Sequence, residues 1–233
     1  MSTSFAPSRP VGRVVDARPA TQPAPTTLTG RFITLEPLSP SHASALYSVI
    51  CGAAHASLWD YMFDGPFKTP ADFDAFITSK SSSRDPLFFA LLDPTTTPVG
   101  YASLMRIDIP NRVVEIGHVM FSPALQRTRA ATEALFMLVR HALEDLGFRR
   151  CEWKCDTLNA PSRRAAARMG FLEEGVFRQH MIVKGRSRDT AWFGMLDGEW
   201  PRAREGFERW LDDGNFDEEG RQRRRLEDCR EKM

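Results

Sequence analysis

Residues 121–132 join an apolar run to the start of the most regular amphipathic stretch of the chain. A strand-to-helix junction of this kind directs several free backbone N–H groups at one point, and the positive end of the helix dipole reinforces them. Ala130 and Ala131 are small enough for close approach, and Arg127 and Arg129 can add charge-assisted hydrogen bonds. The segment therefore favours an anion such as a phosphate, although every such junction shares this backbone geometry.

A second motif, Asn159-Ala-Pro-Ser162, follows another strand-like run and opens a short helix that ends at Gly170. Asn or Ser in this position is a capping residue more often than a functional one. If both helices begin at the same end of one sheet, however, their N-termini flank a single cleft. A phosphate-bearing cofactor could then lie between them.

Apolar alternation and helical spacing predict the elements that must position these motifs. The central three expected strands are joined by short turns, which indicates an antiparallel meander. The whole pattern indicates an α+β (mixed α/β) fold on one sheet. Expected strands are 31–36, 87–92, 98–107, 112–121, 148–156, 171–183 and 188–196, and expected helices are 39–50, 70–81, 131–146, 161–169 and 201–211.

Composition divides the chain of 233 residues into a leader, one domain and a charged end. Residues 1–27 hold five prolines and are expected to be a disordered leader; a mitochondrial presequence is the weaker alternative, because prolines oppose its helix. Residues 28–212 form the expected domain. Residues 213–233, with acids interspersed among the arginines, are expected to be a solvated tail or helix rather than a nucleic-acid arm.

Charge and cysteine usage narrow the class of protein further. The net charge of +1 gives no strong attraction to nucleic acid or to an acidic membrane, and no apolar run approaches the ~18 residues of a membrane span. The four cysteines form no C-x-x-C motif, so we expect buried thiols and no metal site. We expect a cytoplasmic protein, either a monomer or a homodimer.

Taken in order, the motifs resemble those of a known family. They are Glu115-Ile-Gly-His-Val-Met-Phe-Ser-Pro, Gln126-x-x-Arg-x-Ala, Asn159-x-x-Ser162 and Gly170-Phe171. Together they resemble a GCN5-related N-acetyltransferase (GNAT) of the RimJ/RimL-like branch, over about residues 28–196. The resemblance implies a single domain with a central, mostly antiparallel, splayed sheet flanked by helices, and acetyl-CoA as co-substrate.

The resemblance also implies roles for individual residues. The loop from Gln126 onward would hold the pyrophosphate, the strand before it would hold the pantetheine arm, and Ser162 would protonate the departing thiolate. Arg129 stands where the family usually has the first glycine of the loop, so its guanidinium could bind phosphate or block the groove. The implied coenzyme-binding set is Val119, Met120, Phe121, Gln126, Arg127, Thr128, Arg129, Ala130, Ala131, Thr132, Asn159 and Ser162.

The motifs indicate the general base, the group that takes the proton of the amine, less directly. An attacking ammonium with a pKa near ~10 must lose a proton, so a carboxylate, a histidine or a relayed water is needed. Glu115 occupies the position at which histone-type members carry a catalytic glutamate, although a structural carboxylate paired with an arginine is an equal alternative. His118 points to the opposite face unless a bulge re-aims it, and Met181 stands where RimL-like enzymes have a glutamate.

The acceptor is expected at the early aromatic segment and the last strand pair. Trp59, Tyr61 and His180 are the candidate acceptor-binding residues, although clustered aromatics are equally consistent with a small satellite core. We expect a small-molecule amine, such as an amino acid or a specialised metabolite. The alternatives are a protein amine, terminal or on a side chain, and a non-catalytic acyl-CoA-binding module.

Overall fold

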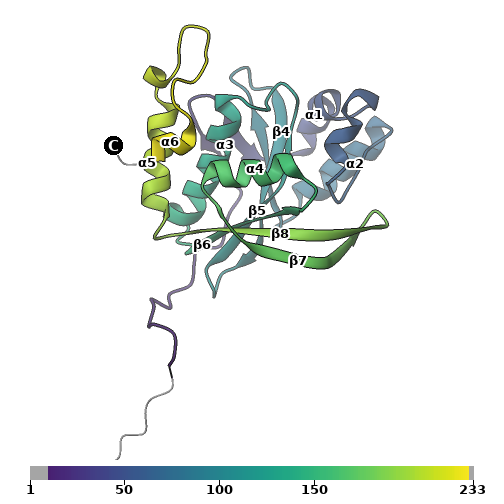
Figure 1. Cartoon of the computed structure of the whole chain (residues 1–233). Helices are drawn as coiled ribbons and strands as arrows, with labels where there is room; N and C mark the ends of the chain where they lie inside the picture. Colours follow the sequence, from purple (N-terminus) through teal and green to yellow (C-terminus); the bar gives the residue numbers. More distant parts are fainter. Residues whose placement is uncertain (1–9, 231–233) are drawn as a thin grey trace, which may run out of the picture.

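The computed structural model describes residues 10–230 and contains one eight-stranded sheet (Figure 1). The strands are β1 (Leu28–Thr29), β2 (Thr34–Pro37), β3 (Leu87–Leu92), β4 (Pro98–Asp108), β5 (Val113–Phe121), β6 (Arg150–Asp156), β7 (Leu172–Val183) and β8 (Arg186–Leu196). Their order across the sheet is β1-β2-β3-β4-β5-β6-β8-β7. Only β5 and β6 are parallel neighbours; the other pairs are antiparallel. The expected mixed α/β fold with a mostly antiparallel sheet is confirmed.

Six α-helices accompany the sheet within the described residues. They are α1 (Ala43–Ile50), α2 (Pro70–Ser81), α3 (Arg129–Arg140), α4 (Ala160–Met169), α5 (Trp200–Leu211) and α6 (Leu226–Arg230). A 3-10 segment, η2 (Ala53–Trp59), precedes α2, and a π-helical turn, η3 (His141–Asp145), follows α3. The single helix expected over 131–146 is therefore an α-helix that widens in its last turn.

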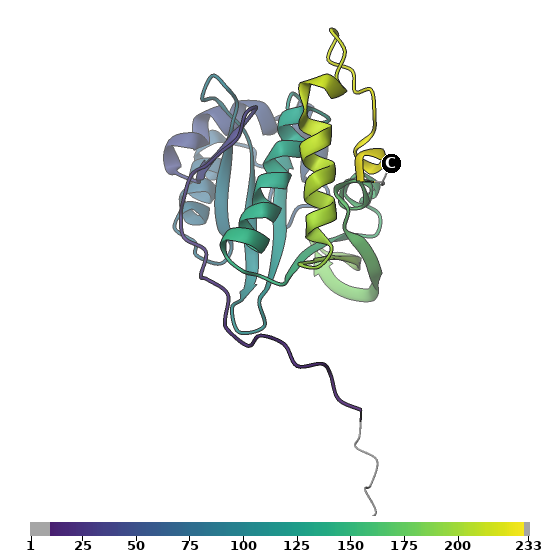
Figure 2. The same ribbon diagram turned by 90° about the vertical axis from the view of Figure 1, so that its left-hand side faces the viewer.

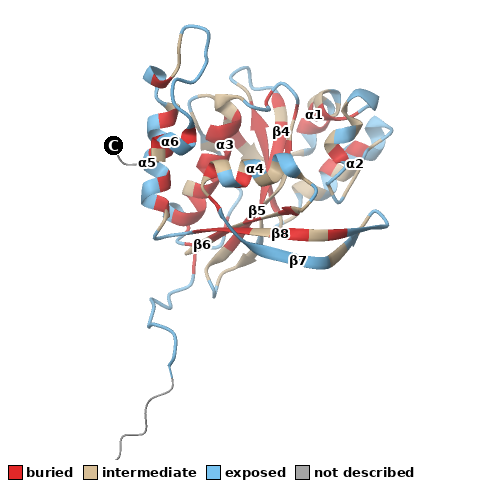
Figure 3. Cartoon of the chain, viewed as in Figure 1, coloured by how far each residue is buried: buried red, intermediate tan, exposed pale blue. Residues whose placement is uncertain are grey.

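Both faces of the sheet are covered, and β3 shows this most directly. All six of its residues are buried, because Phe89 and Leu91 face the cluster around α3 while Phe88, Ala90 and Leu92 face α1 and α2. A strand buried on both faces is apolar throughout rather than alternating. Figure 3 shows the resulting burial along the central strands and α3, and Figure 2 shows α3 and α5 side by side on one face.

The core also includes chain on either side of residues 28–212. Ala20 is buried and donates its backbone N–H to the carbonyl of Ile109 at 3.2 Å. Leu226 and Cys229 of α6 are buried against α5. Residues 1–9 of the expected leader and residues 231–233 of the expected tail lie outside the described residues.

Residues 10–230 contain neither a membrane-spanning helix nor a metal-holding cluster of side chains. No helix among them is long and apolar enough to cross a membrane. No group of three or more His, Cys, Asp or Glu residues in this range is arranged to hold a metal ion.

Candidate active site

The parallel strands β5 and β6 separate part-way along their length. They pair from Val113 with Arg150 to Glu115 with Glu152 and no further, while β6 continues with β8 as far as Asp156. The β6-facing edge of residues 116–121 therefore has no strand partner among the described residues. Backbone N–H and C=O groups that lack a ladder partner remain available to a ligand that enters the opening.

A β-bulge re-aims His118 within β5. Tyr101 of β4 pairs with Met120, but Ser103 pairs with Gly117, so one β4 residue lies opposite both His118 and Val119. His118 takes a positive φ of 48° at this point, and its side chain lines the pocket. In an undistorted strand His118 would face away from Glu115, so the bulge brings the two side chains to one site.

The N-termini of α3 and α4 lie at the same end of the sheet, because each helix follows one of the two parallel strands (Figure 1). At α3, the Thr128 hydroxyl accepts from the N–H of Ala131 at 3.1 Å. The amides of Arg127, Arg129 and Ala130 have no acceptor among residues 10–230. Unsatisfied amides at a helix N-terminus favour an anion.

The Arg129 side chain turns away from this group of amides and holds the C-terminal segment, residues 211–230. Its guanidinium donates to the Leu211 carbonyl at 2.6 Å and to Asp213 at 3.0 Å. It also lies between the rings of Phe32 and Phe216, 4.2 and 4.0 Å from their centroids. Neither expected role of the guanidinium, phosphate contact or obstruction, matches these contacts. Arg129 offers the cleft only its backbone amide.

Asn159 both caps α4 and faces the cleft. Its Oδ1 accepts from the N–H of Ser162 at 3.1 Å, so the expected capping role is present. Its Nδ2 donates to no group of residues 10–230, and the residue lines the pocket. The amide group can therefore cap the helix with its oxygen while it donates to a ligand with its nitrogen.

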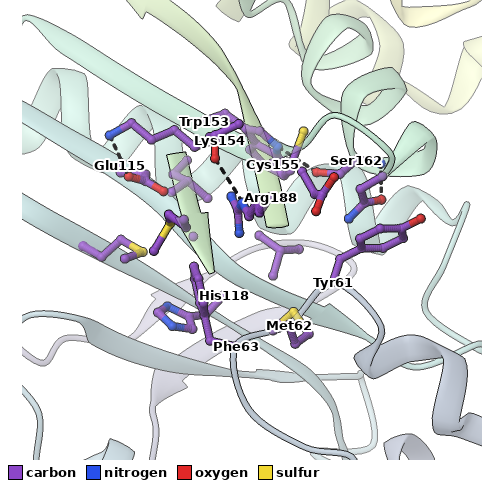
Figure 4. A pocket seen from close by; sticks show the side chains of 18 of the residues that line it. Tyr61, Met62, Phe63, Glu115, His118, Trp153, Lys154, Cys155, Ser162 and Arg188 are labelled. Carbon is purple, nitrogen blue, oxygen red and sulfur yellow. Dashed lines mark hydrogen bonds and ion pairs between the residues drawn. The ribbon is translucent and has the colours of Figure 1, made fainter. Parts of the chain in front are cut away.

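The pocket continues from the strand opening into the space between β5, β6, β8 and the segment after η2 (Figure 4). Glu115 lies in its wall, with Oε2 2.9 Å from Lys154 Nζ and 3.2 Å from Arg106 Nε. Burial raises the pKa of Glu115, against the lowering effect of the two cations. Both ion pairs fall on Oε2, which is buried and accepts no further hydrogen bond from the described residues.

His118 is half-buried and holds a neutral imidazole. Desolvation lowers its pKa to about 4, and the charge of Lys80 adds to this effect. The Ser103 hydroxyl donates to the Gly117 carbonyl at 3.1 Å and lies 3.2 Å from His118 Nδ1. Because that hydroxyl hydrogen is used, Ser103 accepts from Nδ1–H, which leaves the lone pair of the ring on Nε2.

Ser162 has two partners at the start of α4, the indole of Trp153 and the thiol of Cys155. The indole Nε1–H of Trp153 donates to Ser162 Oγ at 3.0 Å, across from the buried thiol of Cys155. An oxygen that accepts from the indole keeps its own hydrogen for another acceptor. The hydroxyl therefore remains able to donate a proton within the pocket.

Two hydrogen bonds fix the segment after η2, which supplies Tyr61, Met62 and Phe63 to the pocket. Tyr61 Oη donates to the Leu158 carbonyl at 3.0 Å, and Lys184 Nζ, at the tip of the β7–β8 hairpin, donates to the Trp59 carbonyl at 2.7 Å. Figure 1 shows this hairpin tip turned toward the α1–α2 region. The segment from Trp59 to Phe67 is thus tied to β8 and to the β6–α4 loop.

The expected acceptor-binding residues have different positions in the structure. Tyr61 and His180 line the pocket, and His180 Nδ1 lies 3.0 Å from the Thr190 hydroxyl. Trp59 does not line it: its indole is fully buried, donates to the Ile50 carbonyl at 2.8 Å and packs edge-on against Phe67. The satellite core that the aromatic cluster also allowed is therefore the correct interpretation for Trp59.

The pocket residues that sequence reasoning missed include Lys154 and Arg188, and Ser103, which contacts His118 from behind the pocket wall, was missed as well. The alternation of side chains along a strand is the one sequence signal that could have indicated Arg188. It places Arg188 on the same face of β8 as Thr190, and both residues are buried. Ser103 and Lys154 lie on strands whose neighbours in the sheet no local pattern specifies.

Comparison with known proteins identifies the family. Residues 33–172 match the sequence model described as "Acetyltransferase (GNAT) domain". The chain belongs to the GNAT acetyltransferase family. A GCN5-related N-acetyltransferase from Brucella melitensis is 42% identical to this GNAT chain, with a TM-score of 0.89 over 91% of this chain and 97% of that one.

Two further relatives bear on the chemistry of this GNAT chain. A Bacillus subtilis (strain 168) protein, provisionally named ribosomal N-acetyltransferase YdaF, is 33% identical over 101 residues, 43% of this chain. The match spans 55% of the length of YdaF. The microcin C7 self-immunity acetyltransferase MccE, solved with acetyl-CoA and AMP, is 25% identical, with a TM-score of 0.63 over 72% of this chain and 93% of that one.

Proposed function

We propose that this chain transfers the acetyl group of acetyl-CoA to the primary amine of a small molecule, directly and without a covalent enzyme intermediate. The observation that carries the proposal is the continuity of the site. The free edge of β5 and the start of α4 border the pocket that holds Glu115 and His118, and the unsatisfied amides of the α3 N-terminus lie at the same end of the sheet.

The residues of the cleft suit acetyl-CoA, which supplies an activated acetyl thioester. The amides of Arg127, Arg129 and Ala130 would bind the pyrophosphate, and Asn159 Nδ2 would donate to the pantetheine arm. The free edge of β5 around Val119 offers backbone donors for the developing oxyanion. The unsatisfied amides support this assignment because a helix N-terminus favours negative charge.

Acetyl transfer forms a bond from the amine nitrogen to the acetyl carbon and breaks the carbon–sulfur bond. One proton must leave the amine, and one is needed by the sulfur. The Glu115 carboxylate and His118 Nε2 are the proposed acceptors for the amine proton, directly or through water. Burial raises the pKa of Glu115 toward the operating pH, where a general base is most effective.

Ser162 would supply the second proton. Its oxygen is held by the indole of Trp153, which leaves the hydroxyl hydrogen free to donate to the departing thiolate. A preoriented hydroxyl in a largely enclosed site contributes more than the same group in water.

A small acceptor is favoured by the two hydrogen bonds that fix the segment after η2 beside the pocket, Tyr61 to Leu158 and Lys184 to Trp59. A peptide needs an open groove, whereas a small amine fits a closed pocket. The name of YdaF favours the second candidate, a ribosomal-protein amine. The two candidates differ in what they require of Lys184, because a peptide would have to displace that contact.

Calorimetric titration with acetyl-CoA, followed by coenzyme A release across small amines and N-terminal peptides, tests the proposal. Asn159→Asp keeps the capping oxygen and removes the Nδ2 donor, so it should weaken acetyl-CoA binding by about 10-fold without lowering Tm. Asn159→Ser is the matched control for the cap. Binding without turnover on any amine would instead indicate a non-catalytic acyl-CoA-binding module.

A further inference from the structure

Arg188 is a buried cation in the middle of the acceptor pocket (Figure 4). It lies on β8 and is only 6% exposed. Its Nε donates to the Thr190 hydroxyl at 3.1 Å, and its guanidinium carbon lies 5.1 Å from the ring centroid of Phe63. The two terminal nitrogens donate to no group of residues 10–230.

No carboxylate of the described residues forms an ion pair with Arg188, which separates it from the other two cations of the pocket. Arg106 and Lys154 both pair with Glu115, and Lys154 also pairs with Glu152. Asp156 is the remaining carboxylate in the pocket wall, and it lies beyond ion-pair range while accepting from the Leu158 amide at 2.9 Å. Of the three pocket cations, Arg188 is therefore the one that forms no ion pair with the described residues.

An uncompensated buried charge is costly, and the cost falls when an opposite charge binds beside it. The guanidinium presents planar, paired N–H donors, a geometry that matches a carboxylate in a bidentate contact. The Phe63 ring covers one face of the guanidinium. A ligand would therefore contact the terminal nitrogens from within the plane of the guanidinium.

We propose that Arg188 binds a carboxylate of the acceptor, so that the acetylated substrate is an amino acid or a closely similar amine that carries a carboxylate. This inference rests on the proposed function and narrows it to a substrate class. An amine without an anionic group would bring its positive charge beside an unpaired guanidinium, which disfavours its binding. A protein N-terminus has an amide where a free amino acid has its carboxylate, so Arg188 discriminates against it.

Matched acceptor pairs test this assignment: each free amino acid against its carboxamide, with coenzyme A release as the readout. We expect the wild type to prefer the acid by at least about 30-fold in kcat/KM. Arg188→Gln should abolish that preference, and Arg188→Lys should restore part of it. Arg186→Gln is the matched control, because Arg186 is an exposed residue of the same strand that does not line the pocket.

A binding measurement gives a second readout that needs no turnover. N-acetylated amino acids and their amides are titrated with coenzyme A present, and ligand-observed NMR detects which of them bind. Binding of the acids alone, lost in Arg188→Gln while acetyl-CoA affinity is retained, is the expected result. Equal binding of acids and amides, or of neither, would overturn the assignment.

The two proposals fail in different ways. Absence of acetyl-CoA binding by the wild type removes the proposed function, and the acceptor assignment with it. Acetyl-CoA-dependent turnover with equal rates on acids and amides removes only the role of Arg188. A preference for amines bearing a phosphate over those bearing a carboxylate would also overturn the carboxylate assignment.

Discussion

Lys184 donates a 2.7 Å hydrogen bond to the carbonyl oxygen of Trp59, from the tip of the β7–β8 hairpin to the end of η2. The two residues are 125 positions apart in the sequence. Burial removes part of the solvent from the Lys184 ammonium group and so lowers its pKa. The contact thus fixes the start of the segment that supplies Tyr61, Met62 and Phe63 to the acceptor pocket.

Removal of the Lys184 contact should affect the acceptor and not the coenzyme. Lys184→Met keeps most of the aliphatic stem but removes the donor to Trp59, so the segment after η2 loosens. We expect the KM for a small amine to rise about 3- to 10-fold, in line with one charge-assisted hydrogen bond. Acetyl-CoA affinity, measured by calorimetry, should be unchanged. A peptide acceptor used faster by this variant would favour the ribosomal-protein candidate.

Glu115→Gln should lower kcat by about 100-fold if the carboxylate is the base. The expected effect on acetyl-CoA affinity is small, because Glu115 lies beyond the coenzyme amides. The change also removes the negative charge that pairs with Lys154 and Arg106, which lowers stability. The assay is therefore run well below the Tm of the variant, which is measured separately. An unchanged kcat would exclude Glu115 and leave His118 as the base.

The stability of the protein should fall as pH decreases from about 6.5 to 4, in part because of His118. Its folded pKa of about 4 lies below the unfolded value of 6.5, so the unfolded chain binds more protons in this window. Stability is therefore complete above pH 6.5 and is lost toward pH 4. His118→Asn, which tolerates the positive φ, should reduce the loss between pH 7 and 5 by about 2 kcal/mol. Denaturant unfolding at the two pH values checks this, and an identical loss in both proteins would contradict it.

Arg127 and Arg129 should respond differently to the same substitution. Arg129→Met removes the contacts to Leu211, Asp213 and two rings, so unfolding free energy should fall by about 1–3 kcal/mol. Arg127 is exposed, and Arg127→Met should leave Tm within about a degree while it weakens acetyl-CoA binding about 3- to 10-fold. Thermal unfolding and calorimetry of both variants measure the contrast. Equal effects on Tm would refute it.

The order of elements and the location of the cleft could be predicted because they depend on local patterns. The apolar run 87–92 coincides with β3, and the Asn159 motif caps α4 where a helix start was expected. The pocket wall could not be predicted in the same way. Lys184 and Trp59 meet only in the folded chain, and the bulge that turns His118 depends on register between β4 and β5.

Trp59 and Arg129 show a second limit of sequence reasoning. Both residue types are suited to ligand contact, and both stand in segments that line the site. What they contact instead depends on how the chain folds: Ile50 and Phe67, in flanking segments, contact the indole, and Asp213, 84 residues further along the chain, contacts the guanidinium. A motif predicts where a backbone lies more reliably than where a long side chain points.

The contacts of Arg129 link the C-terminal segment to the helix end that faces the cleft. Arg129 is the first residue of α3, and its side chain is held by Leu211 and Asp213. Truncation of the chain after Leu211 would release this helix terminus just where the unsatisfied amides lie. Thermodynamic linkage is reciprocal, so acetyl-CoA bound at those amides would in turn slow proteolytic nicking of residues 212–230.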